Sequence, residues 1–276
     1  MTDNQIPNIK LNNGVQIPQL GFGVYQVPDD QTAQVVLDAL KAGYRSIDTA
    51  AVYGNEAGVG EAIAKSDIPR EELFITSKVW NDDQGYESTL KAFEESLSKL
   101  GLDYLDMYLI HWPTSQRELR LETWKALEEL YKQGKIRAIG VSNFQPNHLV
   151  DLINQSEVTP AVNQVEVHPA MQNVDVIAAD REYGVATEAW SPLAKGEVLG
   201  EKPILDIAER HDKSAAQVVI RWHLQEGRIV IPKSVTPSRI SENIDVFDFE
   251  LSPEEMKAID GLERGYRTGP HPDQFN

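Results

Sequence analysis

The chain has 276 residues, a net charge of −17, 41% hydrophobic residues and no cysteine. The lack of cysteine excludes a disulfide framework, a zinc finger and a cysteine nucleophile. The excess of acidic residues disfavours nucleic acid and anionic membranes as partners, because phosphate contacts need clustered Lys and Arg. There is no signal-peptide pattern and no run of eighteen apolar residues, so we expect a cytoplasmic protein. A small anionic ligand stays compatible with the charge, since one basic pocket can sit within an acidic surface.

The first predicted element is a β-hairpin, in which two short apolar segments flank the turn signal Asn12-Asn13-Gly14. Eight short apolar segments follow and are expected to form strands: Leu20–Tyr25, Ser46–Thr49, Leu73–Val79, Leu105–His111, Ile136–Val141, Ala161–Val167, Val185–Trp190 and Ile229–Pro232. Because the hairpin precedes this series, we expect it to plug one end of the fold.

Segments of helical period separate the predicted strands. Apolar residues from Leu90 to Leu100 recur at helical spacing, and capping-box patterns at Ser214 and Ser252 indicate helix starts. Eight βα units without a linker predict a (β/α)8 barrel, with residues 1–276 as a single domain and the active site at the carboxyl ends of the strands. A doubly wound nucleotide-binding sheet is the alternative, but the glycine-rich stretch at 21–26 lacks the third glycine of its fingerprint.

Reactive side chains gather at the ends of three consecutive predicted strands. Asp48 ends the second strand and Tyr53 follows it, while Lys78 and His111 end the third and fourth. This set suits proton donation to a carbonyl oxygen as a hydride reaches its carbon. A tyrosine has a reference pKa of about 10, and we expect the Lys78 ammonium to lower the pKa of Tyr53. Asp48 would keep Lys78 charged, and a neutral His111 would polarise the carbonyl.

Each of these residues, taken alone, also has a structural explanation. Tyr53 could be a packing residue, Asp48 a cap, and His111 a buried structural histidine. Their convergence at one end of the barrel favours the catalytic interpretation. Ser77, Glu188 and His168 also lie near strand ends and are interpreted as structural support, and the other histidines fall in helices or caps.

Six stretches in chain order then resemble the aldo-keto reductase family: GYRSIDTAAVYGNE from Gly43, TSKVW from Thr76, LDMYLIHWP from Leu105, IGVSNF from Ile139, VNQVEVHP from Val162 and IPKSV from Ile231. The short loops are most similar to the bacterial 2,5-diketo-D-gluconic acid reductase branch. The resemblance implies reversible carbonyl reduction by NADPH without a metal. It also implies that Asp48, Tyr53, Lys78 and His111 are the catalytic tetrad, with Tyr53 as the general acid.

The resemblance further assigns a set of cofactor contacts. These are Ser142, Asn143 and Gln164 for the nicotinamide carboxamide, Trp190 for ring stacking, Ser191, Leu193 and Gly196 for the pyrophosphate, Lys233, Ser234, Val235 and Arg239 for the adenosine 2′-phosphate, and Glu242 and Asn243 for the adenine. Trp190 stands where other members often have Tyr. Two cations and a hydroxyl near a predicted helix start also suit a phosphate group independently, although an ordinary solvated face could have the same composition.

On the substrate side, the resemblance implies that Tyr25, Trp80 and Trp112 line the carbonyl pocket together with His111. The expected substrates are small aldehydes, α-dicarbonyls or keto-sugars, and we expect a monomer. The tail from Gly265 could close over the pocket or lie against the barrel, and the sequence leaves both open.

Two other functions remain open at this point. Lys78 could form a Schiff base in a lyase or aldolase, although Asp48 opposes the neutral lysine that this requires. The barrel could also be a non-catalytic scaffold, which the presence of all four tetrad residues disfavours. A metal-dependent hydrolase is weaker, because no closely spaced histidine pair supplies ligands.

Overall fold

In the computed structural model, residues 6–114 and 118–276 are described; residues 1–5 and 115–117, which the single-domain prediction includes, lie outside this part. Eight parallel strands form one sheet in the order β10-β9-β8-β7-β6-β5-β4-β3. The strands are β3 (Phe22–Gly23), β4 (Ser46–Asp48), β5 (Phe74–Val79), β6 (Leu105–Ile110), β7 (Ile136–Ser142), β8 (Val162–Glu166), β9 (Ala186–Trp190) and β10 (Ile229–Val230). The Gly21 N–H donates to the Val230 carbonyl at 2.9 Å, and the Val230 N–H donates to the Gln19 carbonyl at 2.9 Å. These bonds join the first and last strands, and the predicted (β/α)8 barrel is confirmed.

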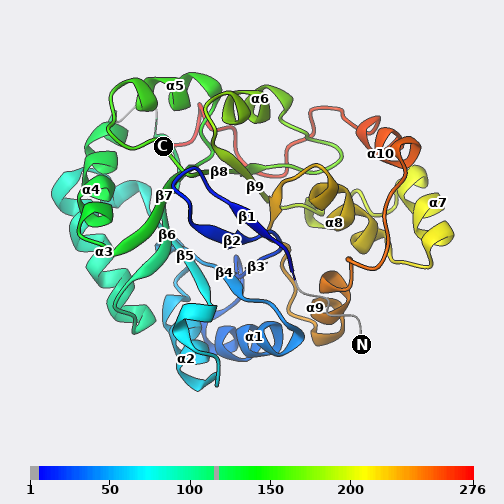
Figure 1. Ribbon diagram of the computed structural model, residues 1–276, viewed down its shortest axis with the longest axis horizontal. Helices are drawn as coiled ribbons and strands as arrows, with labels where there is room; N and C mark the ends of the chain where they lie inside the picture. The colour runs from blue at the N-terminus through cyan, green and yellow to red at the C-terminus, as the bar shows by residue number, and fades with distance from the viewer. Residues whose placement is uncertain (1–5, 115–117) are drawn as a thin grey trace.

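Helices surround the strands on the outside of the barrel (Figure 1). They are α1 (Asp29–Ala42), α2 (Glu56–Lys65), α3 (Tyr86–Leu100), α4 (Arg120–Lys132), α5 (Pro146–Asn154), α6 (Val174–Glu182), α7 (Lys202–His211), α8 (Ala215–Gln225), α9 (Pro237–Ile244) and α10 (Pro253–Asp260). In α3 the apolar residues at helical spacing, such as Phe93 and Leu97, are buried, which fixes the face that packs on the sheet. The side chains of Ser214 and Ser252 accept the predicted capping hydrogen bonds at the starts of α8 and α10.

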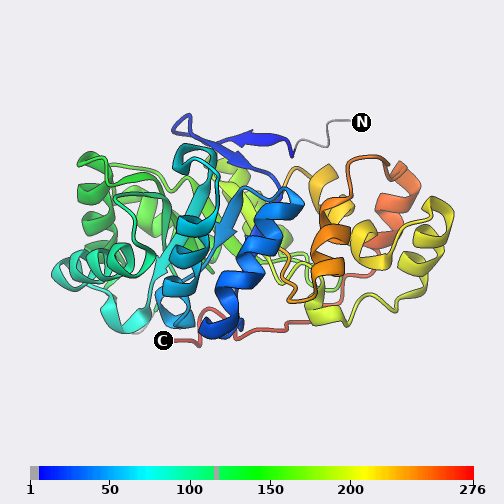
Figure 2. The ribbon, with the colours of Figure 1, turned by 90° about the horizontal axis from the view of Figure 1, so that it is seen from below.

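The predicted hairpin and the C-terminal tail lie at opposite ends of the barrel (Figure 2). Strands β1 (Asn8–Lys10) and β2 (Gln16–Pro18) pair antiparallel, and Ile17 is buried in an apolar cluster with Phe74 and Met107 from the barrel strands. The hairpin therefore plugs one end, as predicted. The opposite end holds the carboxyl ends of the strands and is called the mouth below.

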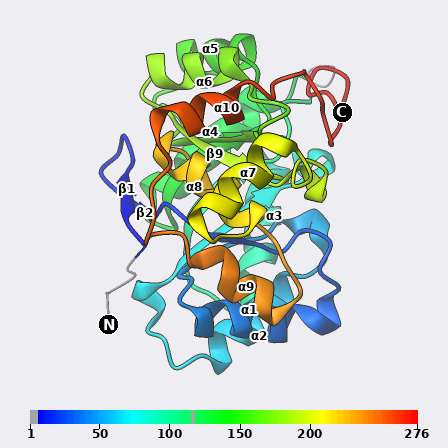
Figure 3. The same cartoon turned by 90° about the vertical axis from the view of Figure 1, so that its right-hand side faces the viewer.

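The first and last predicted strands of the barrel are shorter in the structure than in the prediction. β3 covers only Phe22–Gly23 of the predicted Leu20–Tyr25, and β10 only Ile229–Val230. At this junction the chains pass so closely that a Cβ on Gly21 would lie 3.1 Å from the Ile231 Cγ2, and one on Gly23 would lie 3.3 Å from the Ile231 carbonyl oxygen. Regular pairing is thus limited to a short contact where the barrel closes. Helices α7 and α10 pack together beside the barrel (Figure 3). In the described part of the chain, no helix is long and apolar enough to cross a membrane.

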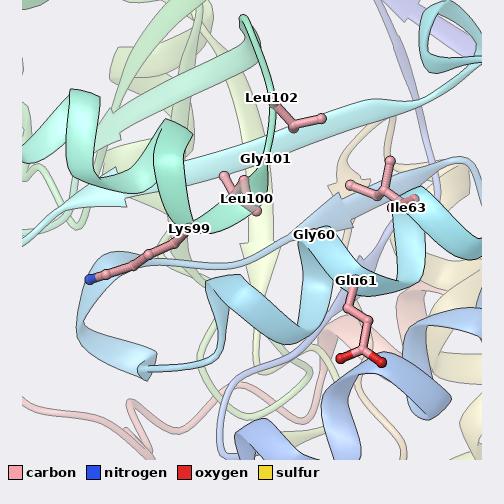
Figure 4. Close-up of a pocket in the computed structure, with 8 residues that line it drawn as sticks. Gly60, Glu61, Ile63, Lys99, Leu100, Gly101 and Leu102 are labelled. Atoms are coloured by element: carbon pink, nitrogen blue, oxygen red, sulfur yellow. The ribbon is translucent and has the colours of Figure 1, made fainter.

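A surface hollow lies between α2 and α3 (Figure 4). Gly60 allows the close approach of these helices, because a Cβ there would lie 2.3 Å from the Leu100 carbonyl oxygen. The hollow is lined by Gly60, Glu61, Ile63 and Ala64 and by residues 99–102. Since residues 99–102 precede the start of β6 whereas His111 follows its end, the hollow does not belong to the mouth.

Candidate active site

Lys78 and Asp48 form a buried ion pair at the mouth. They lie on the neighbouring strands β5 and β4, and the Lys78 Nζ donates to the Asp48 Oδ1 at 2.6 Å and to the Thr49 carbonyl at 2.9 Å. Burial opposes the charged form of Lys78, but the charge of Asp48 and the hydrogen bond to it raise the lysine pKa. Lys78 is therefore an ammonium group at neutral pH.

Tyr53 follows β4 on a short 3₁₀ turn, Ala51–Tyr53, which brings its ring over the ion pair. The Lys78 Nζ lies 5.2 Å from the ring centroid, and the His111 ring lies 5.7 Å away. Burial raises the pKa of Tyr53 to about 12, although the Lys78 charge and hydrogen bond act in the opposite direction. Lys78 lowers the pKa of Tyr53 as expected, but the loss of solvation on burial is the larger effect, so the net shift is upward. Tyr53 is a neutral phenol that keeps its proton.

His111 directly follows β6 and is 7% exposed. Burial first, and then the charge of Lys78, hold its pKa well below the ordinary value of 6.5, so the imidazole is neutral. Its Nδ1 is buried and has no hydrogen-bond partner among residues 6–114 and 118–276. A neutral imidazole at the mouth can donate a hydrogen bond to a polar ligand through one ring nitrogen.

Gln164 connects the ion pair to a second acid. Its Nε2 donates to the Asp48 Oδ2 at 2.8 Å and to the Glu188 Oε2 at 3.0 Å. All three residues are buried: Gln164 is 2% exposed, Asp48 3% and Glu188 1%. Burial, followed by the charge of Asp48, raises the pKa of Glu188 to about 8. Glu188, interpreted from the sequence as structural support, thus belongs to the polar network under the mouth.

The residues predicted to contact the nicotinamide also lie together at the mouth. Ser142 ends β7 and its Oγ donates to the Gln164 carbonyl at 2.7 Å. Asn143 has a left-handed φ of 63°, which asparagine tolerates, and its Nδ2 donates to the His111 carbonyl at 3.0 Å. The Trp190 Nε1 donates to the Asn143 Oδ1 at 2.9 Å, a bond that a tyrosine ring would not make in this form. Asn143 therefore joins Trp190 to the His111 backbone, and Ser142 joins β7 to Gln164 on β8.

The residues predicted to bind the 2′-phosphate follow β10 and lie far along the chain from the tetrad. Lys233 and Arg239 are exposed, Ser234 is 9% exposed, and Val235 is 46% exposed. In the described part of the chain, neither cation forms an ion pair with a carboxylate. The Ser234 Oγ accepts from the Thr236 N–H at 3.1 Å, just before α9 begins.

The two predicted adenine contacts differ in their surroundings. Asn243 is buried on α9, whereas Glu242 is half-buried and its Oε1 accepts a hydrogen bond of 2.6 Å from the Ser214 Oγ at the start of α8. Glu242 therefore already holds α9 against α8.

The predicted pyrophosphate loop follows β9 and contacts the C-terminal tail. Ser191 and Gly196 have positive φ angles of 50° and 95°, and Leu193 packs partly buried against the core. The Lys195 Nζ donates to the Thr268 carbonyl at 2.8 Å, and the hydroxyls of Ser191 and Thr268 lie 3.3 Å apart. The tail thus lies against this loop.

Glu166 fixes the tail at the mouth, which the sequence analysis did not foresee. The backbone N–H and the hydroxyl of Thr268 donate to its Oε1 at 2.6 and 2.7 Å, and the Gly269 N–H donates to its Oε2 at 3.3 Å. A Cβ on Gly269 would lie only 2.5 Å from the Trp190 Cη2. The alternation of Gln164 and Glu166 on one face of β8, continued by His168 two residues beyond the strand, was the available signal, since apolar residues are expected inside a barrel.

The aromatic residues predicted for the substrate pocket separate into two groups. Trp80 and Trp112 contact Phe275 of the tail, with ring centroids 6.1 and 4.6 Å away. Tyr25 is 53% exposed and lies 5.0 Å from the ring of Tyr53. The tail therefore crosses the mouth and brings Phe275 to the two tryptophans, which settles the question that the sequence left open.

A model of the aldo/keto reductase family matches residues 19–264. The chain belongs to the aldo-keto reductase family. It is 55% identical over 268 residues to a glyoxal reductase of Bacillus subtilis, with 97% of this chain and 96% of the relative covered. It is 51% identical over 269 residues to the methylglyoxal reductase DkgA of Escherichia coli, with 97% of each covered.

Solved structures agree with this assignment. The crystal structure of a Gox0644 variant in complex with NADPH is similar to this aldo-keto reductase with a TM-score of 0.94 and 47% identity, and 98% of each chain is covered. The family and the barrel expected from the sequence are thus confirmed.

Proposed function

We propose that this aldo-keto reductase reduces the carbonyl group of small aldehydes and α-dicarbonyl compounds, with Tyr53 as the proton donor. The chain is an NADP-dependent oxidoreductase of this family. The observation that carries the proposal is the buried Lys78–Asp48 pair beneath the neutral phenol of Tyr53, next to the neutral imidazole of His111.

The residues at the mouth divide the work of carbonyl reduction. NADPH, when bound, supplies the hydride. Tyr53 donates its proton to the carbonyl oxygen, so that the carbonyl becomes an alcohol and the tyrosine becomes a phenolate. The Lys78 ammonium stabilises that phenolate, and Asp48 keeps Lys78 charged in a buried site. The imidazole of His111 donates a hydrogen bond to the carbonyl oxygen and orients it.

The residues fit NADPH at both ends. Lys233 and Arg239 have no carboxylate partner in the described part of the chain and are free to bind a 2′-phosphate, with Ser234 and the backbone at Val235 between them. At the other end, we assign the nicotinamide carboxamide to Ser142, Asn143 and Gln164, and ring stacking to Trp190. Ser191, Leu193 and Gly196 bind the pyrophosphate in this assignment, and Glu242 and Asn243 lie beside the adenine.

The pocket favours small substrates. Phe275 contacts both Trp80 and Trp112, and Trp80 contacts His111, so these rings form an apolar boundary near His111. Relatives named glyoxal reductase and methylglyoxal reductase act on such compounds, which supports α-dicarbonyls as the substrate class. The Schiff-base alternative is disfavoured, because Lys78 is held charged by its bonds to Asp48 and Thr49.

The substrate class is tested by ranking kcat/KM, followed by NADPH oxidation, over a panel of carbonyl compounds. The panel comprises glyoxal, methylglyoxal, a keto-sugar such as 2,5-diketo-D-gluconate, and a bulky aromatic ketone. We expect the α-dicarbonyls to rank first and the bulky ketone last. A bulky ketone at the top would contradict the proposed pocket.

A further inference from the structure

Gln164 is held by carboxyl groups from two different strands. One hydrogen of its Nε2 goes to Asp48 on β4 and the other to Glu188 on β9. Gln164 and Glu188 are register partners on the adjacent strands β8 and β9, so the contact follows directly from the strand pairing. Both N–H groups of the amide are therefore used within the protein.

The chemistry of the network fixes which way the amide faces. Asp48 forms an ion pair with Lys78, and the carboxylate of such a pair only accepts hydrogen bonds. The NH₂ group of Gln164 must therefore face the acids, and its Oε1 faces away from them. Among residues 6–114 and 118–276, no donor reaches this oxygen. With only Asp48 as a partner, one N–H would be left unpaired and the amide plane could turn.

A nicotinamide carboxamide needs an acceptor for its own NH₂ group. The Oδ1 of Asn143 already accepts from the Trp190 Nε1, and its Nδ2 donates to the His111 carbonyl. The Oε1 of Gln164 is the side-chain acceptor of this group that no donor in residues 6–114 and 118–276 uses, whereas the Ser142 Oγ and the Asn143 Oδ1 each accept one bond already.

We propose that Glu188 is a positioning residue, which holds the amide of Gln164 so that the Gln164 Oε1 accepts a hydrogen bond from the carboxamide NH₂ of the cofactor. This inference rests on the proposed assignment of Gln164 to the carboxamide. Glu188 itself does not touch the cofactor.

The charge state of Glu188 is consistent with this role. Burial and the charge of Asp48 raise its pKa to about 8, so at pH 7 it is mostly protonated and adds no second negative charge beside Lys78. The side chain then acts as a neutral acceptor for Gln164. Glutamine has the same shape and also offers a neutral acceptor oxygen, so Glu188→Gln should preserve the arrangement.

The test compares the binding of NADP⁺ with that of its 3-acetylpyridine analogue, in which a methyl group replaces the carboxamide NH₂. Dissociation constants are measured by quenching of tryptophan fluorescence. The variants are Glu188→Leu, Glu188→Gln and Gln164→Leu, with Thr187→Val as the control on the same strand. Thr187 suits this purpose because its hydroxyl donates to Asp180 in the helical layer and not to the mouth.

The wild type and the control should prefer NADP⁺ over the analogue by the same factor. Gln164→Leu and Glu188→Leu should reduce this preference by about threefold or more, as for a lost hydrogen bond, whereas Glu188→Gln should retain it. A merely structural role of Glu188 would weaken the binding of both nucleotides equally and leave the preference intact.

The outcomes separate the two claims. If Gln164→Leu loses the preference but Glu188→Leu keeps it, the role of Glu188 is overturned and the assignment of Gln164 stands. If Gln164→Leu keeps the wild-type preference, the assignment of Gln164 fails and the inference fails with it. Should circular dichroism show that Glu188→Leu does not fold, Glu188→Thr, which suits a strand but is too short to reach Gln164, is measured in its place.

Discussion

The Nζ of Lys78 lies 2.6 Å from the Oδ1 of Asp48, and the two side chains are 0% and 4% exposed. The same carboxylate accepts from Gln164 through its other oxygen, so Asp48 joins the ion pair to the group assigned to the cofactor. A change at Asp48 is therefore expected to alter folding stability as well as chemistry.

Asp48→Asn should lower the free energy of unfolding by about 3 kcal/mol, because it leaves the Lys78 ammonium buried without its counter-charge. Urea unfolding at pH 7, followed by circular dichroism, measures the loss. The double variant Asp48→Asn/Lys78→Met should recover part of it, since the uncompensated charge is then removed. A single variant as stable as the wild type would contradict the buried ion pair.

Protonation of His111 should not lower kcat/KM of the wild type at mildly acidic pH. Burial and Lys78 hold the pKa of this histidine well below 6.5, so the imidazole keeps its neutral form as pH falls through its ordinary range. We expect kcat/KM for carbonyl reduction to show no inflection near pH 6.5. An inflection there that disappears in His111→Gln would show that His111 titrates normally.

Arg239→Ala should raise the KM for NADPH by about tenfold or more and leave the KM for NADH nearly unchanged, because only NADPH has the 2′-phosphate that the guanidinium would bind. Arg210→Ala is a suitable control, since Arg210 pairs with Glu255 on α10. Equal effects on the two cofactors would refute the phosphate assignment.

Gly269→Ala should displace the tail or the indole of Trp190, because the new Cβ would lie 2.5 Å from the Trp190 Cη2. We expect a raised KM for the carbonyl substrate and a change in tryptophan fluorescence. Gly200→Ala is the matched control, since a Cβ there meets nothing within 4 Å. Unchanged kinetics in Gly269→Ala would mean that the tail does not restrict the mouth.

The barrel and the tetrad could be predicted because they depend on local patterns. Apolar segments alternating with helical periodicity identify the βα units, and the carboxyl ends of parallel strands must meet at one end. This places Asp48, Lys78 and His111 together from their positions along the chain alone.

Other features could not be predicted because they depend on contacts between distant segments. The tail has no periodicity, and its path is set by Thr268 on Glu166 and by Phe275 on Trp112. The pairing of Glu188 with Gln164 depends on the strand register. The pKa of Tyr53 depends on how far burial outweighs Lys78, which no sequence pattern reveals.

The role of Tyr53 as the proton donor is tested most directly by Tyr53→Phe, with turnover and NADPH binding measured on the same preparation. The substitution keeps the ring that packs against His111 and Tyr25 and removes only the hydroxyl. We expect kcat to fall by about a hundredfold or more while the dissociation constant for NADPH stays near the wild-type value. Substantial turnover in this variant would contradict proton donation by Tyr53.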